Sequence, residues 1–177
     1  MDDTVLILNV TKEDARELLE IYTPYVLNTA ISFEIEPPTL TEFEGRIVAI
    51  TSKYPYLKAV DINGKILGYC YANTFKERAA YDHCVETTIY LREEAKRQGI
   101  GSALYAKLEK ELVKRGILNA NACIGVPPQE NPYVNMDSVL FHEKMGYKMV
   151  GTFHNCGRKF DQWFHMCWME KLLGDYK

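Results

Sequence analysis

Apolar and polar residues follow two periods along the chain, and these periods predict its helices and strands. From residue 100 to 112 apolar residues recur at every fourth position while charged residues occupy the other faces, as an amphipathic helix requires. Residues 39–53 and 135–145 are also predicted to be helical, and Thr11 is a suitable N-cap for a first helix that Pro24 is expected to interrupt. Runs with strand character occupy residues 5–10, 57–62, 65–72, 84–91, 121–126, 147–153 and 163–171.

Turn residues connect these elements into one domain. Asn63 and Gly64 separate two of the apolar runs, and this dipeptide is a strong signal for a two-residue β-hairpin. Gly116 supplies a C-terminal stop for the helix that begins at residue 100. The order strand, two helices, three strands, helix, strand, helix and two strands predicts an α/β domain with a mixed sheet. The chain has 177 residues without a repeat or linker, so we expect a single domain over residues 1–177.

Composition and charge narrow the possible partners. The net charge is −3 and there is no dense run of Lys and Arg, so nucleic acid is not expected as a partner. No run of about 18 apolar residues would span a membrane, and residues 1–4 lack the basic and apolar parts of a signal peptide, so a cytoplasmic location is expected. The five cysteines are scattered without a Cys-x-x-Cys pair, which predicts free, mostly buried thiols and no metal site.

A glycine turn before the helix at residue 100 offers a site for a phosphate. Its sequence is Arg97-Gln98-Gly99-Ile100-Gly101-Ser102. The N–H groups of such a turn and the positive end of the helix dipole bind anions, and Arg97 adds a charge. A pyrophosphate has to approach the main chain closely, where a Cβ at Gly99 or Gly101 would stand in its way. The alternative is an ordinary strand–turn–helix corner, but the basic residues just before the glycines favour an anion cradle.

A glutamate lies in the strand predicted at residues 84–91, a few residues before the cradle. The strand period of two places Glu86 with Thr88 and Tyr90 on one face. An arbitrary strand glutamate is more often surface-facing or salt-bridged than functional. The short distance along the chain to the cradle makes Glu86 a candidate site residue.

The helix predicted at residues 135–145 carries a polar stripe. Asn135, Ser138 and His142 are spaced i, i+3 and i+7, so they share one side, while Met136 and other apolar residues lie elsewhere. The stripe either faces water or faces the edge of the sheet. In the second case it offers a histidine and an amide to a ligand bound at the cradle.

The loop that precedes Glu86 contains an arginine and a tyrosine. Arg78 can bind a carboxylate or phosphinate group through two hydrogen bonds, and the phenol of Tyr81 adds a donor. A solvated loop is the alternative. The pair therefore marks a possible site for an acidic small molecule.

Four blocks of sequence occur in an order typical of one family. They are Ser32-Phe33-Glu34 with Pro37-Pro38; Arg78-Ala79-Ala80-Tyr81 with Glu86-Thr87-Thr88-Ile89-Tyr90; Arg97-Gln98-Gly99-Ile100-Gly101-Ser102-Ala103-Leu104-Tyr105; and residues 135–147. Together they resemble the GNAT superfamily of N-acetyltransferases, in particular the phosphinothricin acetyltransferase and L-amino acid N-acyltransferase family. The resemblance runs from residue 5 to about residue 171. It implies the GNAT fold, an α/β domain whose mixed, mostly antiparallel sheet is flanked by helices.

The resemblance implies acetyl-CoA as co-substrate and no metal. The pyrophosphate would bind the N–H groups of residues 97–102, and Asn135 would help to hold the coenzyme. The pantetheine arm would pair like an extra strand along Ile89, Tyr90 and Leu91. A splayed or bulged strand there would leave an N–H group free for the thioester carbonyl.

The resemblance also implies the reaction and its acceptor. Acetyl transfer to the α-amine of a small amino-acid-like molecule, such as phosphinothricin, methionine sulfoximine or methionine sulfone, is expected by direct attack. Glu86 would be the general base, and His142 falls where many superfamily members have a tyrosine that protonates the leaving thiolate. The residues expected to contact the acceptor are Phe33, Lys76, Arg78, Tyr81 and Thr88.

Two other functions stay open at this point. One is acetylation of another amine, such as a polyamine, an aminoglycoside or a peptide N-terminus, which an acidic pocket in place of Arg78 and Tyr81 would favour. The other is a coenzyme-A-binding module without turnover, against which the presence of both Glu86 and His142 argues. The resemblance further suggests a homodimer, for which the aromatic C-terminal strands would supply apolar surface.

Overall fold

A computed structural model describes residues 5–175 of this protein. Residues 1–4, on which the expected cytoplasmic location partly rests, and residues 176–177 lie outside the described range. Within the described range, seven strands pair in the order β1-β2-β3-β4-β5-β7-β6. The strands are β1 Leu6–Asn9, β2 Tyr56–Val60, β3 Ile66–Thr74, β4 Cys84–Leu91, β5 Asn119–Val126, β6 Lys148–Lys159 and β7 Gln162–Leu172. The β4–β5 pair is parallel and the other pairs are antiparallel, which confirms a mixed, mostly antiparallel sheet.

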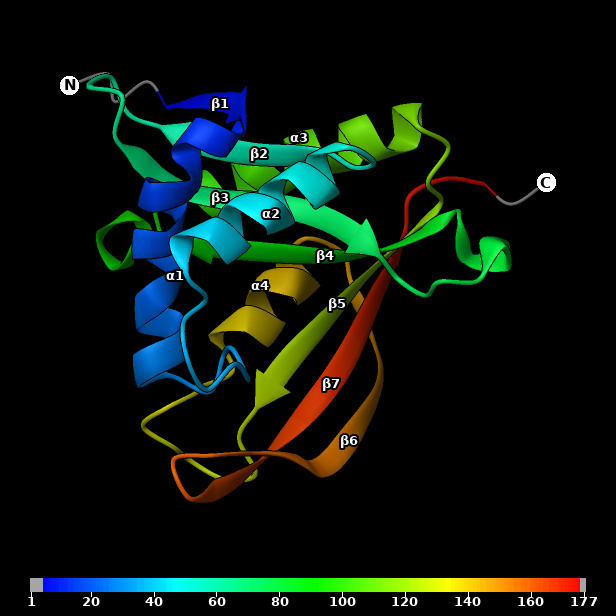
Figure 1. Ribbon diagram of the computed structural model, residues 1–177. Helices are drawn as coiled ribbons and strands as arrows, with labels where there is room; N and C mark the ends of the chain where they lie inside the picture. The colour runs from blue at the N-terminus through cyan, green and yellow to red at the C-terminus, as the bar shows by residue number, and fades with distance from the viewer. Residues whose placement is uncertain (1–4, 176–177) are drawn as a thin grey trace.

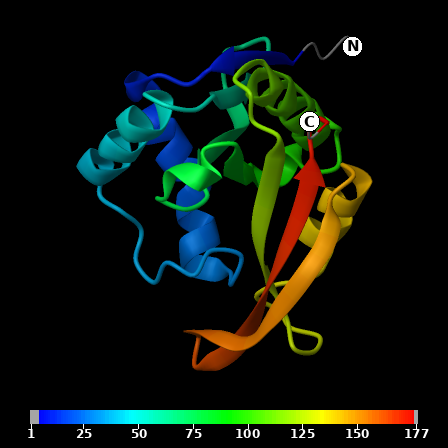
Figure 2. The same cartoon turned by 90° about the vertical axis from the view of Figure 1, so that its right-hand side faces the viewer.

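Helices cover both faces of the sheet. They are α1 Ala15–Asn28, α2 Leu40–Thr51, α3 Ile100–Lys114 and α4 Asp137–Lys144, with short 3-10 turns η1 Lys12–Asp14, η2 Ala79–Tyr81 and η3 Glu93–Ala95. Helices α1 and α2 lie on one face, and α3 and α4 lie on the other, as the two perpendicular views show (Figures 1 and 2). Within residues 5–175, no helix combines the length and the hydropathy needed to cross a bilayer.

Each face of the sheet has its own core, and the predicted helical stripes line them. Leu104, Leu108 and Leu112 of α3 are fully buried against one face. Leu18 of α1 and Ile47 of α2 are buried against the other. Burial of a leucine or isoleucine side chain stabilises the fold by about 1.5–3 kcal/mol, so these stripes hold the helices in place.

Both predicted turns form at the expected glycines, although the hairpin loop is longer than the expected two residues, since residues 61–65 separate β2 from β3. Gly64 has φ +82° in the β2–β3 hairpin, and Gly116 has φ +76° after α3, so both use the left-handed region that glycine enters without strain. Thr39 caps α2, because its hydroxyl accepts from the N–H of Glu42 and the Glu42 carboxylate accepts in return from the N–H of Thr39 at 2.7 Å.

Three expectations about local structure are wrong. Helix α1 continues through Pro24 to Asn28, because its buried face holds the helix together despite the lost hydrogen bond. Strand β6 extends to Lys159, well beyond the expected end at residue 153, because its pairing with β7 resumes at Gly157 after an irregularity. The thiols are not mostly buried either, since Cys123 and Cys156 are exposed.

The sheet opens between β4 and β5. Only the first three residues of each strand pair: Cys84, Val85 and Glu86 lie opposite residues 119–121. Beyond this joint β5 runs on beside β7, and the two halves of the sheet diverge (Figure 1). The rest of β4 therefore has an edge that faces no other strand in the described structure, and the candidate site lies along it.

Candidate active site

The free edge of β4 presents the backbone groups of every second residue. The carbonyl of Val85 accepts from the side-chain amide of Asn121 on β5 at 3.3 Å, so Val85 points its backbone groups toward β5. Successive residues of a strand point these groups to opposite edges, so Ile89 and Leu91 share the free edge and Tyr90 faces β3. Ile89 and Leu91 are thus placed to pair with an extended ligand. Tyr90, expected from sequence as a third such residue, belongs to the sheet and the core.

A tyrosine of α1, which the sequence did not mark as a candidate site residue, reaches this edge. The hydroxyl of Tyr25 donates to the carbonyl of Leu91 at 2.5 Å, and the Lys96 ammonium lies 5.2 Å from the ring centre. Burial raises the pKa of Tyr25, so its hydroxyl keeps its proton. A ligand that pairs along β4 would meet this hydroxyl. A tyrosine in a helical stripe gives no sign of such a contact 66 residues away.

The turn before α3 has the backbone conformation of an anion cradle. Gly99 has φ +81° and Arg97 has φ +62°, so both residues adopt left-handed conformations. The first helical hydrogen bond runs from the N–H of Ala103 to the carbonyl of Gly99 at 3.0 Å, which leaves the N–H groups of residues 100–102 ahead of the helical ladder. Together with the helix dipole, these groups suit a pyrophosphate. This supports the predicted site.

The structure gives Gly101 a different purpose from the one inferred from sequence. A Cβ at Gly101 would lie 3.2 Å from the ring of Phe141 and 3.5 Å from Ile89. Its missing side chain therefore allows α3 to pack closely against α4 and β4, whereas an added Cβ would not point at a ligand. Gln98 also acts locally, since its side-chain amide donates to the carbonyl of Glu94 at 2.6 Å.

Helix α4 begins beside the cradle. The side chain of Arg97 is 89% exposed and lies 3.7 Å from the carboxylate of Asp137. The side-chain carbonyl of Asn135 accepts from the N–H of Asp137 at 2.9 Å and so forms an Asx turn just before the helix. Arg97 is therefore free to turn toward an anion, whereas Asn135 already has a structural partner.

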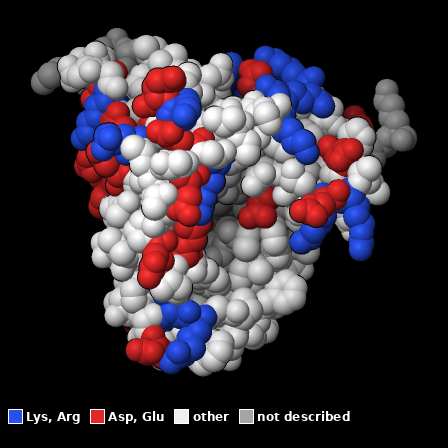
Figure 3. Space-filling model, in the orientation of Figure 1, with Lys and Arg blue, Asp and Glu red and all other residues white. Residues whose placement is uncertain are grey.

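Glu86 is the last residue of the β4–β5 joint and lies at the point where the edge of β4 becomes free. Its side chain is half-buried, and burial raises the pKa of its carboxyl group while the charge of Lys76 opposes the rise. Glu86 shares the sheet face covered by α1 and α2, where the molecule is hollowed and an acidic side chain lies within the hollow (Figure 3). A half-buried carboxylate with a raised pKa is suited to accept a proton.

His142 is buried on the opposite face, with partners at both ring nitrogens. Its Nδ1 lies 2.7 Å from the carbonyl of Ser138, so this nitrogen carries the proton and donates. Its Nε2 then accepts from the hydroxyl of Tyr105 at 3.0 Å. Burial lowers the pKa of His142 to about 4, so the ring is neutral at pH 7. Of the two alternatives left open by the sequence, the polar stripe thus faces inward at His142, and the apolar Met136 and Leu140 are exposed.

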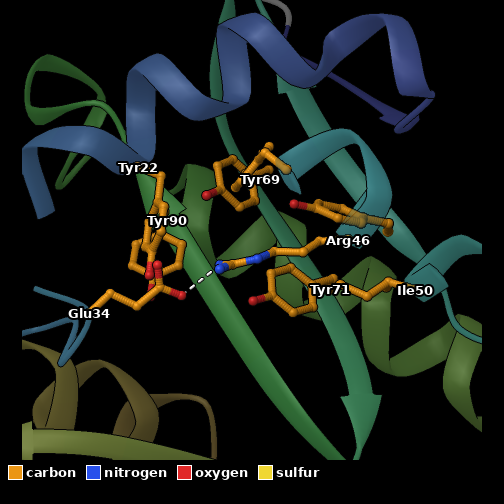
Figure 4. A pocket seen from close by; sticks show the side chains of 9 residues that line it. Tyr22, Glu34, Arg46, Ile50, Tyr69, Tyr71 and Tyr90 are labelled. Carbon is orange, nitrogen blue, oxygen red and sulfur yellow. Dashed lines mark hydrogen bonds and ion pairs between the residues drawn. The ribbon is translucent and has the colours of Figure 1, made fainter. Parts of the chain in front are cut away.

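A cavity of about 70 Å³ opens against Tyr71 of β3 and Tyr90 of β4 (Figure 4). Tyr71 lies opposite Thr88 across β3 and β4, and burial raises its pKa to about 12. At the rim, Arg46 of α2 and Glu34 form an ion pair at 2.6 Å. The other tyrosines of the wall are Tyr22, Tyr56 and Tyr69. Sequence reasoning missed this cavity because its tyrosines come from four separate elements.

Of the residues predicted to contact the acceptor, Lys76 lies close enough to influence Glu86, whereas Arg78 and Tyr81 lie on an exposed turn. Lys76 lies 5.8 Å from the ring centre of Trp168 and acts on the charge of Glu86. Arg78 and Tyr81 lie on the exposed turn at η2, and Tyr81 packs on Phe75 at 5.9 Å.

Among the residues described, no three His, Cys, Asp or Glu side chains gather to hold a metal.

A strand with a free edge, followed by a left-handed turn that exposes helix N–H groups, is the arrangement expected for binding acyl-CoA in the GNAT fold. Residues 7–168 match the family described as acetyltransferase (GNAT) domain. Because the match covers nearly the whole chain, the chain belongs to the GNAT acetyltransferases, and it is an N-acetyltransferase.

Individual relatives give a more specific match within this family. The chain is 33% identical to a phosphinothricin N-acetyltransferase of Streptomyces coelicolor, with 92% of each chain covered. It is also 33% identical to the phosphinothricin N-acetyltransferase of Streptomyces viridochromogenes, over 86% of this chain and 79% of that one. The crystal structure of a phosphinothricin acetyltransferase from Sinorhizobium meliloti in complex with acetyl-CoA superposes with a TM-score of 0.88 at 32% identity, covering 97% of this chain and 89% of that one.

Proposed function

We propose that this protein transfers the acetyl group of acetyl-CoA to the α-amine of a small amino-acid-like acceptor, such as phosphinothricin, methionine sulfoximine or methionine sulfone. The observation that carries the proposal is Glu86, a half-buried carboxylate with a raised pKa where β4 parts from β5. The names of the relatives, which include methionine sulfoximine/methionine sulfone acetyltransferases, support this class of acceptor.

The coenzyme fits the residues present. The N–H groups of residues 100–102 and the side chain of Arg97 would hold its pyrophosphate, and the free edge at Ile89 and Leu91 would pair with its amide-containing arm. Acetyl-CoA supplies the acetyl group as a reactive thioester. An N–H group on that edge would stabilise negative charge on the thioester oxygen.

Glu86 acts as the general base in this proposal. The α-amine of a free amino acid is mostly protonated at neutral pH, because its ionised carboxylate raises the pKa of the amine above the value of about 7.7–8.0 found for a chain N-terminus. Glu86 takes a proton from the amine, directly or through a water molecule, and the amine then attacks the thioester carbon. A new C–N bond replaces the C–S bond, the attacking nitrogen gives its second proton to solvent, and the thiolate that leaves takes up one proton, so the proton finally released is the one that Glu86 accepted.

The hydrogen bonds of His142 argue against its predicted role as the proton donor to the thiolate. Both of its ring nitrogens have protein partners, so direct donation would require breaking the hydrogen bond to Ser138. We therefore assign His142 a positioning role: as a neutral acceptor it orients the hydroxyl of Tyr105 beneath β4. The proton donor to the thiolate is left to solvent or to another group.

The acceptor is proposed to bind on the face of the sheet that carries Glu86. Lys76 would attract its carboxylate, and Arg78 and Tyr81 would reach it after movement of the exposed η2 turn. The acceptor's side chain would extend toward Phe33 and Thr88. This placement puts the α-amine beside the general base.

A homodimer and a cytoplasmic location are part of the proposal. Strand β6 is an exposed edge with apolar side chains, among them Met149, Val150 and Phe153. Such an edge is a liability unless something covers it, and a second copy would do so. Light scattering during size-exclusion chromatography would report a mass near twice that of the monomer.

The experiment that tests the function is a thiol-release assay with acetyl-CoA and a panel of amines. We expect turnover with methionine sulfone, methionine sulfoximine or phosphinothricin. The panel also contains spermidine, an aminoglycoside and a peptide. Preference for one of these amines would show that the acceptor belongs to that class and not to the amino-acid-like molecules. Tight coenzyme binding without turnover of any amine would reject an enzymatic function.

A further inference from the structure

A buried lysine of the β6–β7 hairpin has no part in the chemistry described so far. Lys159 ends β6 and is 6% exposed, and its ammonium group donates to the backbone carbonyl of Ser32 at 2.7 Å. The two residues are 127 positions apart in sequence. Burial lowers the pKa of Lys159, and the charge of Glu34 opposes that effect. A cation placed here at a desolvation penalty must have a use that an apolar side chain would not supply.

The bond belongs to a set of contacts that closes the α1–α2 loop, residues 29–39, onto the second half of the sheet. The N–H of Ala30 donates to the carbonyl of Tyr133 at 2.9 Å. The ring of Phe33 lies where a Cβ of Gly157 would be, since the nearest ring atom is 2.3 Å from that position. Gly125 likewise lacks a Cβ where the carbonyl of Ala30 approaches within 2.6 Å. The loop therefore bridges the opening between the two halves of the sheet.

The same loop is tied to the first half of the sheet through Ser32 and Glu34. The hydroxyl groups of Ser32 and Tyr22 are 2.7 Å apart, and the N–H of Glu34 donates to the Ser32 hydroxyl at 3.2 Å. Glu34 pairs with Arg46 at the rim of the tyrosine cavity (Figure 4). Ser32 is thus a junction whose carbonyl is held from β6 and whose hydroxyl is held from α1.

We propose that Lys159 is a positioning residue that clamps the α1–α2 loop through the carbonyl of Ser32 and so sets the acceptor side of the active site. The clamp fixes Phe33 against Gly157 and Glu34 against Arg46, which are the parts of the loop nearest to the proposed acceptor. This inference rests on the proposed function, because it concerns the acceptor of that reaction. The coenzyme cradle lies at α3 and is not contacted by the clamp.

The test compares three variants. Lys159→Met removes the donor and keeps most of the stem, Lys159→Arg keeps a donor, and Lys148→Met removes an exposed lysine of the same strand as a control. For each, KM and kcat are measured with methionine sulfone and with acetyl-CoA, and hydrogen exchange is followed at the amides of residues 30–34. Thermal unfolding checks that each variant folds.

We expect Lys159→Met to raise KM for the acceptor on the order of tenfold, because a hydrogen bond from a charged donor is lost, while KM for acetyl-CoA changes less than about twofold. Exchange at residues 30–34 should accelerate in the same variant. Lys159→Arg should recover much of both properties, and Lys148→Met should resemble the wild type. If Lys159→Met does not fold, Lys159→Gln replaces it, because it removes the charge and the reach of the lysine while keeping a polar end, and the same outcomes are measured with it.

Two outcomes would overturn the clamp: equal effects on both KM values, or unchanged exchange at residues 30–34 in the Lys159→Met variant. A wild-type protein that acetylates no amine would reject the proposed function instead. The exchange measurement needs no turnover, so it would still decide whether Lys159 holds the loop.

Discussion

Replacement of Glu86 by Gln tests the proposed chemistry most directly. The change keeps the size and the hydrogen-bonding ability of the side chain but removes its basicity. Loss of a general base costs about 10²–10⁴-fold in rate, and burial makes Glu86 a stronger base than an exposed glutamate. We therefore expect kcat/KM at pH 7 to fall by about this factor, while KM for acetyl-CoA stays near the wild-type value.

The pH dependence of the Glu86→Gln variant gives the sharper result. The variant can use only amine that is already deprotonated, and because the pKa of a free amino acid's α-amine is not below the value of about 8.0 for a chain N-terminus, this fraction rises at least roughly tenfold from pH 7 to pH 9. The ratio of wild-type to variant rate should shrink by about that factor over the same range. Steady-state kinetics with methionine sulfone at several pH values measure it, with Glu143→Gln on the exposed side of α4 as the control. A constant ratio from pH 6 to pH 9 would remove Glu86 as the base.

Stability supplies an independent check on the same residue. Burial raises the pKa of Glu86 in the folded protein above its unfolded value, so the fold favours the protonated form. That preference is fully present below the unfolded pKa and is lost as pH rises through the raised folded pKa. At pH 7 the ionised carboxylate therefore destabilises the folded protein. Glu86→Gln should raise Tm slightly while lowering activity. A lowered Tm would show that the carboxylate has a structural role.

Three further predictions concern the acceptor, the cradle and the buried histidine. Arg78→Ala should raise KM for acidic acceptors and leave KM for acetyl-CoA unchanged, and equal effects on both would reject its assigned contact. Gly101→Ala should lower Tm, because the new Cβ meets Phe141 at 3.2 Å, but by less than an overpacking penalty of about 1–3 kcal/mol, since Ala is favoured over Gly in a helix by about 0.5–1 kcal/mol; a raised Tm would contradict this packing. The folded pKa of His142, about 4, lies below its unfolded value of about 6.5, so its contribution to stability is present above pH 6.5 and is lost as pH falls toward 4. Urea unfolding should show this loss, roughly 3 kcal/mol, in the wild type but not in His142→Gln.

Periodicity and turn chemistry were sufficient to predict most of the fold. The stripe of leucines on α3 and the Asn-Gly hairpin each depend on residues close together in sequence, and both are confirmed. Pro24 shows the limit of local rules, because the packing of the whole of α1 outweighs one missing hydrogen bond. The length of β6 likewise depends on its pairing with β7, which no local pattern contains.

The site was predictable only where it follows one segment of the chain. The cradle is a single run of residues, and Glu86 lies in the strand just before it, so both could be found from sequence. Tyr25 and Lys159 act through backbone carbonyls 66 and 127 residues away, and a carbonyl leaves no mark on a sequence pattern. His142 was found, but its burial was not, because a helical stripe does not reveal which side faces the sheet.

The short joint between β4 and β5 has a mechanical consequence. With only three residue pairs across it, we expect the joint to act as the pivot for any movement of one half of the sheet against the other. Glu86 is itself one of the paired residues, so its position changes little when the halves move, whereas the α1–α2 loop spans both halves at a distance from the pivot. Movement of the two halves of the sheet against each other would therefore change the access of the acceptor to the site far more than it would displace the carboxylate of Glu86.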